Sequence, residues 1–168
     1  ASTAPAGRPV VVMDTAPAAV LGALEDPQVG SREEAIVANV GNFHTLAFHL
    51  RRGAIAGLFE HHTGKLSQAQ LEELLTQLAA GTLSNDEVFA EHGHGALVVD
   101  RSPAGPGGPW VAVTGPRRGV LADSRLKPYL AVPYGDMMMA GCWGLVRACA
   151  YHLPWTAEVI GGALRQRL

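Results

Sequence analysis

The stretch AIVANVGNFHTLAFHLRRGAIAGLFEHHTG, residues 35–64, decides the fold of this chain. It holds three apolar runs separated by two short polar turns, one at Asn42 and one at Arg51-Arg52-Gly53. The runs are rich in β-branched and aromatic residues and predict strands near 35–40, 43–50 and 54–60. Turns this short make consecutive strands antiparallel neighbours, so the segment predicts a block of three antiparallel strands.

Helices and strands alternate through the rest of the chain. Ser67 and Gln70 fit a capping box at the start of a helix, and Gly81 is the expected C-cap. Ahead of the three strands we expect a strand at 9–13, a helix at 16–24 capped by Asp14 or Thr15, and a loop at 26–31. After them we expect a short capped turn at 84–87, strands at 93–99, 110–115 and 129–133, and helices at 119–127, at 137–152 (buried all round) and from 156 onward.

This order predicts an α/β protein with a mixed sheet. The three antiparallel strands are followed by strands that alternate with helices, which makes those later strands parallel to their neighbours. A chain of 168 residues, 48% of them hydrophobic, is long enough to bury one core, so we expect a single domain over 9–168. Residues 1–8 lack the apolar core of a signal peptide and are expected to be a linker or an expression remnant.

Charge and cysteine content exclude several classes of function. The formal net charge of −2 gives no electrostatic case for binding nucleic acid or an anionic membrane. No apolar run in the sequence is long enough to span a bilayer. Cys142 and Cys149 would lie about 10 Å apart along one helix, too far for a disulfide. We therefore expect two buried thiols and a reducing, cytoplasmic setting.

The first turn of the three-strand block is a candidate anion site. Backbone N–H groups of Gly41 and Asn42, the Thr45 hydroxyl and a protonated His44 imidazole can together hold a phosphate. The alternative is a hairpin turn in which Gly41 and Asn42 supply positive φ angles. Strand alternation places His44 and Thr45 on opposite faces of the sheet.

A second candidate site is the segment Thr114-Gly115-Pro116-Arg117-Arg118. It ends an expected parallel strand, and open α/β sheets bind ligands at the carboxyl ends of such strands. Arg117 or Arg118 can clamp a phosphate or a carboxylate through two hydrogen bonds. The alternative is a pair of solvated arginines on a turn.

Two histidine-rich segments are candidate metal ligands. The first is Glu60-His61-His62-Thr63-Gly64 and the second is Glu91-His92-Gly93-His94-Gly95. A His-x-His sequence flanked by glycine can place both imidazoles on one ion, so zinc is conceivable at His61, His62, His92 and His94. The alternative is a set of loop histidines that order backbone carbonyls or contact a substrate.

Four segments carry a family resemblance, in the order of the expected elements. They are VVMDTAPAAVLGAL (11–24), VANVGNFHTLAF (37–48), VAVTGPRRGVL (111–121) and VPYGDMMMAGCWGLVRACA (132–150). Together they resemble the ribonuclease-H-like second lobe of the actin, Hsp70 and sugar-kinase superfamily of ATPases. In that comparison the second segment is similar to a phosphate loop and the third to the adenosine loop.

The resemblance implies a lobe that binds a nucleotide or another phosphate ligand, with ATP and Mg²⁺ as cofactor and a phosphotransferase as the whole protein. Asp14, Asn39 and His44 would be catalytic, the first two by orienting a hydrated metal. The ligand would be held by Gly41, Asn42, Thr45, Thr114, Gly115, Arg117 and Arg118. Asn39 and Pro116 depart from the Asp and Gly of the superfamily. The resemblance also implies a partner, either a first lobe or a second copy of the chain.

The blocks VGNFHTLAF, GLFEHHTG, GHGA, TGPRR and GDMMMAG also resemble a prokaryotic family of unknown function labelled as a pyruvate formate-lyase activating enzyme. Such a radical enzyme needs three closely spaced cysteines for its iron–sulfur cluster, and this chain has two, so we expect no cluster. Two alternatives to the phosphate-binding lobe stay open. One is a metal-dependent hydrolase that uses His61/His62 and His92/His94, and the other is a non-catalytic assembly module built on helix 137–152.

Overall fold

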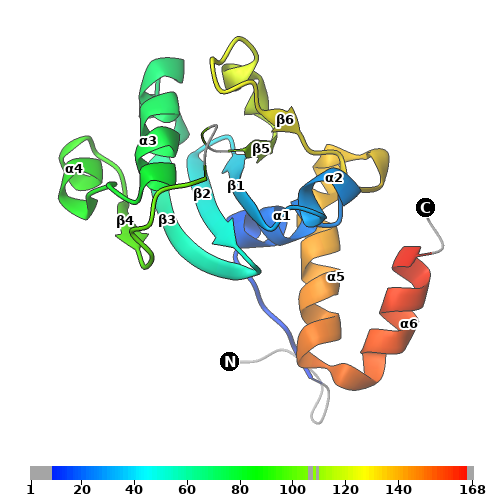
Figure 1. Cartoon of the computed structure of the whole chain (residues 1–168). Coiled ribbons are helices and arrows are strands. Elements are labelled where there is room, and N and C mark those ends of the chain that lie inside the picture. Colours follow the sequence, from blue (N-terminus) through cyan, green and yellow to red (C-terminus); the bar gives the residue numbers. More distant parts are fainter. Residues whose placement is uncertain (1–8, 106–107, 109, 166–168) are drawn as a thin grey trace.

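A six-stranded mixed sheet forms the centre of this computed structural model, which describes residues 9–105, 108 and 110–165. The strand order is β4-β3-β2-β1-β5-β6 (Figure 1). The strands are β1 (Glu34–Val40), β2 (His44–Arg51), β3 (Ala54–His62), β4 (Gly95–Val98), β5 (Val111–Thr114) and β6 (Tyr129–Leu130). The predicted linker at 1–8 lies outside the described residues.

The predicted block of three antiparallel strands is confirmed. β1 pairs with β2 and β2 with β3, both antiparallel, and the turn between β2 and β3 has positive φ at Arg52 (50°) and Gly53 (76°). β4 adds an antiparallel strand to β3. β5 runs parallel to β1, and β6 runs parallel to β5. The expected mixed α/β sheet is therefore present.

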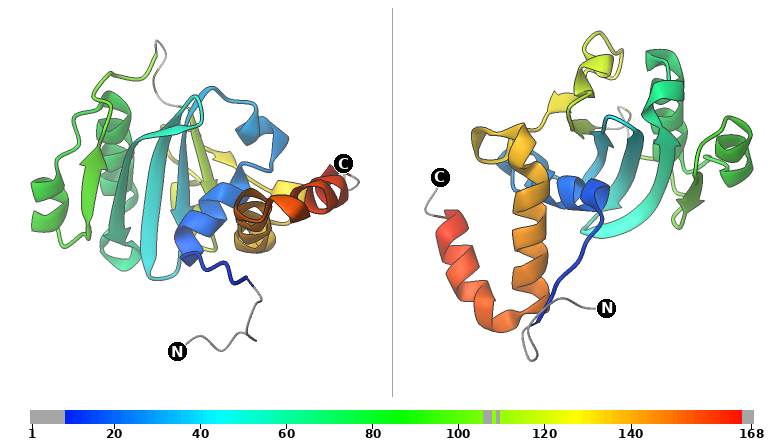
Figure 2. Two further views of the ribbon diagram at one scale, coloured as in Figure 1. Left: turned by 90° about the horizontal axis from the view of Figure 1, so that it is seen from below. Right: turned by 180° about the vertical axis from the view of Figure 1, so that it is seen from behind.

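Helices cover both faces of the sheet (Figure 2). On one face α3 (Gln68–Ala80) packs Leu71, Leu75 and Leu78 into a core with Phe59 and Val113. On the other face α1 (Thr15–Ala23) packs Val20 and Ala23 against β1 and β5. We call these the α3 face and the α1 face. The remaining helices and 3-10 turns are α2 (Pro27–Gly30), η1 (Thr63–Lys65), α4 (Asn85–Ala90), η2 (Arg118–Leu121), η3 (Pro133–Gly135), η4 (Met137–Met139), α5 (Ala140–His152) and α6 (Pro154–Arg165).

The main helix caps form as predicted. Asp14 is the N-cap of α1, and its carboxylate accepts a hydrogen bond from the Ala16 N–H at 3.1 Å. Ser67 and Gln70 make both hydrogen bonds of a capping box at the start of α3. Gly81 ends that helix in the left-handed conformation, with a φ of 70°.

α5 packs across α1 through two glycines that leave no room for a side chain. A Cβ atom on Gly144 would lie 1.8 Å from the Ala18 carbonyl oxygen, and one on Gly22 would lie 1.7 Å from the Ala140 carbonyl oxygen. The two backbones are therefore in direct contact. α6 packs in turn against α5, on the side away from the sheet (Figure 2).

The prediction of a fully buried helix at 137–152 is wrong. Residues 137–139 form η4, and of the 13 residues of α5 only Ala140, Gly144 and Ala148 are buried. These three lie four residues apart and form the narrow face that meets α1. Cys142 is exposed and Cys149 is half-buried, so the expectation of two buried thiols is also wrong.

Three shorter elements also differ from prediction. Residues 9–13 form no strand, because Val10 and Val12 project into solvent and none of the described strands lies beside them to pair with. The predicted helix at 119–127 is only η2, since Lys127 has a φ of 45° and Pro128 follows it. The strand predicted at 129–133 is β6, of two residues.

The predicted loop at 26–31 contains α2, and its cap explains how β6 is held. The buried Asp26 carboxylate caps α2 by accepting from the Gln28 N–H. Its other oxygen accepts hydrogen bonds from the Tyr129 hydroxyl at 3.0 Å and from the Val132 N–H at 2.9 Å. One carboxylate therefore ties α2 to the edge strand β6.

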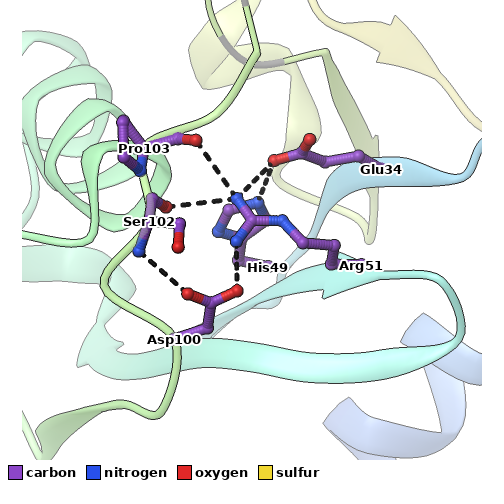
Figure 3. A network of polar contacts seen from close by, with 6 residues as sticks. All are labelled: Glu34, His49, Arg51, Asp100, Ser102 and Pro103. Atoms are coloured by element: carbon purple, nitrogen blue, oxygen red, sulfur yellow. Dashed lines mark hydrogen bonds and ion pairs between the residues drawn. The ribbon is translucent and has the colours of Figure 1, made fainter.

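A polar network fixes the end of the sheet where β1 begins and β2 ends (Figure 3). Arg51 donates hydrogen bonds to Glu34 at 2.8 Å, to Asp100, and to the backbone carbonyls of Ser102 and Pro103. Hydrogen bonds from Ser102, together with Arg51, lower the pKa of Asp100 to about 2. The network anchors the segment after β4 to the sheet.

Among the described residues, no helix has the length and apolar character needed to cross a membrane.

Candidate functional site

A cavity of about 240 Å³ opens at the carboxyl ends of the parallel strands β1 and β5. We call it the sheet-edge cavity. The strand ends contribute Asn39, Gly41, Thr114 and Gly115 to its wall. The facing wall comes from Thr15 and Ala19 of α1 and from the start of α5 with η4. The structure thus brings parts of the two predicted phosphate sites together at one cavity, with Asn39 and Gly41 from the first and Thr114 and Gly115 from the second.

Two polar side chains stand at the back of the sheet-edge cavity. Asn39 and Thr114 are partners in the parallel register of β1 and β5, and both are buried. The Thr114 hydroxyl oxygen has no hydrogen-bond partner among the residues that the structure describes. A buried hydroxyl without a partner costs about 1–3 kcal/mol. Thr114 thus lines the cavity, and its buried hydroxyl has unused hydrogen-bonding capacity.

The two glycines of this wall are required by close backbone approach. Gly115 has a φ of 97°, and a Cβ there would lie 2.5 Å from the Val40 carbonyl oxygen. A Cβ on Gly41 would lie 2.7 Å from the His44 carbonyl oxygen. Gly41 and Asn42 do not adopt positive φ, so the hairpin alternative is wrong on that point. Gly41 is needed for space rather than for its φ angle.

Several predicted site residues lie away from the cavity wall. Asp14 caps α1, and Asn42 is exposed in the turn after β1. Thr45 is completely buried, and its hydroxyl is 2.9 Å from the Thr63 hydroxyl. Arg118 donates to the Ala131 carbonyl at 2.8 Å, while Arg117 is exposed two residues beyond Gly115.

Three histidines converge at the neighbouring part of the same sheet edge. His44 begins β2, His62 ends β3, and His94 directly precedes β4. One ring nitrogen from each lies within 4.8 Å of the others. We call this group the histidine cluster. Glu60 borders it, with a carboxylate oxygen 3.7 Å from His44 Nδ1.

The histidine cluster differs from the predicted set of four. It contains His62 and His94, and its third member is His44, which was predicted as part of the anion site. His61 points to the α3 face and is buried, with its Nδ1 3.2 Å from the His62 carbonyl oxygen. His92 is exposed and held at a φ of 68°. Sequence reasoning placed Glu60 in the first histidine-rich segment but missed His44 as a member of this group.

The electrostatics of the cluster favour the neutral form of the His62 ring. Desolvation lowers the pKa of His62 below its usual value, and the neighbouring His94 and His44 imidazoles lower it further. A neutral imidazole is the form that binds a metal ion.

Comparison with known families identifies a matching family. The family model described as "Putative pyruvate format-lyase activating enzyme", a domain of unknown function (DUF1786), matches residues 1–120. The chain belongs to this family. The match includes every residue of the histidine cluster and the β1 and β5 residues of the sheet-edge cavity, and it ends before β6 and α5. Searches of curated proteins and of solved structures gave no match.

The cysteines of this DUF1786 chain do not fit the iron–sulfur cluster that the family description implies. Cys142 and Cys149 are free thiols that stand two turns apart on α5. Seven residues of helix separate their Cα atoms by about 10 Å along the axis. The cluster of such a radical enzyme needs three cysteines close together at one point. The family description is therefore a label that this chain's own residues do not support.

Proposed function

We propose that the sheet-edge cavity binds the phosphate group of a small-molecule ligand, with a nucleotide as the leading candidate. The proposal assigns the chain to the ribonuclease-H-like lobes of the actin, Hsp70 and sugar-kinase superfamily. Strand order supports this assignment, because β3-β2-β1 is an antiparallel block followed by β5 and β6 parallel to β1. The cavity also lies where open α/β sheets hold ligands, at the carboxyl ends of parallel strands.

The observation that carries the proposal is that the buried Thr114 hydroxyl has no hydrogen-bond partner among the described residues. Native proteins seldom leave a buried hydroxyl without a partner, and such groups mark positions that a ligand or water completes. Here Thr114 belongs to a wall that also contains Asn39, Gly41 and Gly115, and its hydroxyl is buried without a partner among the described residues. A phosphate oxygen accepts hydrogen bonds from hydroxyl, amide and backbone N–H donors alike.

The size and charge of the cavity limit what it can hold by itself. Pockets that enclose whole small molecules measure about 300–1,000 Å³, and this cavity has about 240 Å³. It fits a phosphate group, while the rest of a nucleotide would lie outside it. We propose that a first lobe or a second copy of the chain covers that part. Its described wall residues carry no charge, so Mg²⁺ and the exposed Arg117 would supply positive charge at the mouth.

An assembly role is the second candidate, and one feature favours it. Large apolar side chains on α5 and α6 face solvent, among them Tyr151, Trp155 and Val159. Dimerisation of the isolated chain without any effect of nucleotide or phosphate would support this reading over the first.

Free Cys142 and Cys149 support the expected reducing, cytoplasmic setting in either case.

A binding assay with a charge substitution tests the proposal. The wild-type chain is titrated calorimetrically with ATP, ADP, GTP and inorganic phosphate, with and without Mg²⁺, and its unfolding midpoint is followed in parallel. Ligand that binds the native state raises that midpoint by mass action. Asn39→Asp introduces the carboxylate of the superfamily, and we expect it to tighten Mg²⁺–nucleotide binding by about fivefold.

The matched control is Asn42→Asp, which adds the same charge three residues later, in the exposed turn after β1 and outside the cavity wall. It is expected to leave Mg²⁺–nucleotide affinity unchanged. Equal effects of the two substitutions, or the lack of a shift with every ligand, would count against binding at this cavity.

A further inference from the structure

We propose that His44, His62 and His94 bind one transition-metal ion, with zinc as the best match. This site is separate from the sheet-edge cavity and does not depend on the phosphate ligand. The three ligand atoms lie within 4.8 Å of one another, and the ring centroids are 4.4 to 5.1 Å apart. Neutral imidazole nitrogen is a preferred ligand of zinc.

The distances need only a small contraction. Zinc binds histidine nitrogen at about 2.0–2.1 Å, which places the nitrogens of a tetrahedral site about 3.4 Å apart. His44 and His94 are exposed and His62 is partly buried, so the rings have room to turn toward a common ion. Rotation about the side-chain torsions is enough, and the backbone does not have to move.

The backbone positions of the three ligands are rigid. His44 and His62 are direct cross-strand partners in the β2–β3 ladder. The His94 N–H donates to the Glu60 carbonyl at 2.9 Å, which fixes the third ligand to β3. Ligands carried on paired strands are held more accurately than ligands on free loops. The site is thus built into the sheet.

The surroundings supply charge and an open coordination position. Glu60 lies 3.7 Å from His44 Nδ1 and can orient that ring or take up a proton from a water on the ion. Three histidines with the fourth position left to water are the ligand set of hydrolytic and hydrating zinc centres. We therefore infer an open site whose fourth ligand is water or an oxygen atom of a substrate.

The cluster stands next to the sheet-edge cavity on the α1 face. Asn39 pairs with Leu46 and Leu46 with Glu60, so Asn39 and Glu60 are two strands apart in one row. Two strand spacings measure about 10 Å. An ion at the cluster would be close enough to meet an extended ligand that is anchored in the cavity, although neither site requires the other.

Metal titration of protein that carries no affinity tag tests the inference. Zinc is first removed with EDTA, and Zn²⁺ binding is then measured by calorimetry and Co²⁺ binding by its visible absorption, which is intense for a tetrahedral site. We expect one ion per chain. His44→Ala, His62→Ala and His94→Ala should each weaken binding by about a hundredfold or more, because loss of even an outer partner costs 10–100-fold.

The matched control is His92→Asn, which removes an exposed histidine two residues from His94. Asparagine tolerates the φ of 68° at this position, so the variant should fold and bind zinc as the wild type does. Urea unfolding shows whether each cluster variant is folded. If His44→Ala and His62→Ala do not fold, His94→Ala alone still tests the inference. Absence of a stoichiometric ion, or equal zinc loss in His92→Asn and the cluster variants, would overturn the inference.

Discussion

Asn39 and Thr114 lie side by side as register partners on the parallel strands β1 and β5, and both line the sheet-edge cavity. Their neighbours along the same face, Val37 and Ala112, are apolar and pack against α1. The α1 face therefore changes from apolar to polar at the carboxyl end of the two strands. This change from apolar to polar side chains marks the place where the sheet can bind a ligand.

The buried Thr114 hydroxyl, which has no partner among the described residues, predicts an unusual stability result. Thr114→Val keeps the shape of the side chain and removes an oxygen that has no partner among the described residues. We expect the unfolding free energy of the ligand-free variant to equal that of the wild type or to exceed it by up to about 1–2 kcal/mol. The variant should bind phosphate ligands at least about fivefold more weakly. Urea unfolding and calorimetry measure the two effects.

Thr45→Val is the control for this substitution. Its hydroxyl is paired with the Thr63 hydroxyl in the interior, so removal leaves Thr63 unsatisfied. The variant should lose about 1–3 kcal/mol of unfolding free energy. If Thr114→Val is destabilised as much as Thr45→Val, the Thr114 hydroxyl has a structural partner and the ligand argument fails.

Gly115 is expected to tolerate no side chain. Its φ of 97° and the 2.5 Å approach to the Val40 carbonyl oxygen both oppose a Cβ atom. Gly115→Ala should lower the unfolding free energy by about 2 kcal/mol or more. Gly119→Ala, in open space four residues later, should change it by less than about 1 kcal/mol. Similar losses in both variants would show that Gly115 is not constrained as described.

The contact between α1 and α5 depends on Gly144. Gly144→Ala drives a methyl group against the Ala18 carbonyl and should cost about 3 kcal/mol or more. Gly141→Ala lies almost one turn earlier, with no heavy atom within 4 Å, and should stabilise α5 by about 0.5–1 kcal/mol. Thermal and urea unfolding of the pair measure this difference, and equal behaviour would contradict the direct backbone contact.

The network around Arg51 predicts a pH dependence of stability. The pKa of Asp100 falls from 3.8 to about 2 in the folded chain. A lowered folded pKa adds stability that is complete above the unfolded value and is lost as pH falls toward the folded value. Asp100→Asn should therefore lower the urea midpoint at pH 7, and its difference from wild type should shrink between about pH 4 and pH 2. A difference that is constant over this range would contradict the role of the ionised carboxylate.

The strand block was predictable because its signals are local. Apolar runs and the tight Arg52-Gly53 turn fix β1, β2 and β3 within one or two residues. The capping box at Ser67 is equally local. The packing of helix 137–152 was harder to predict, because an apolar sequence does not show which face of the helix packs against a neighbour. Its buried residues are the small Ala140, Gly144 and Ala148, whereas the large Leu145 and Tyr151 are exposed.

The histidine cluster shows what local patterns cannot predict. The tight turn pairs Arg51 with Ala54, and a regular ladder would carry that register to His44 and His61. An irregularity between His49 and Leu50 inserts one extra residue of β3, and His44 pairs with His62 instead. A shift of one residue exchanges the faces of a strand. The bulge therefore determines that His62, and not His61, joins the cluster. No pattern in the sequence predicted this bulge.

The proposed phosphate site is tested most directly by an amide NMR titration of the folded chain. Inorganic phosphate or Mg²⁺–ADP is added up to about 10 mM, a concentration that reveals even very weak binding. The account predicts that the Gly41 and Gly115 amide signals shift with ligand, while Gly53, in the turn at the opposite end of the sheet, does not. Unchanged Gly41 and Gly115 signals, or shifts centred elsewhere, would contradict it.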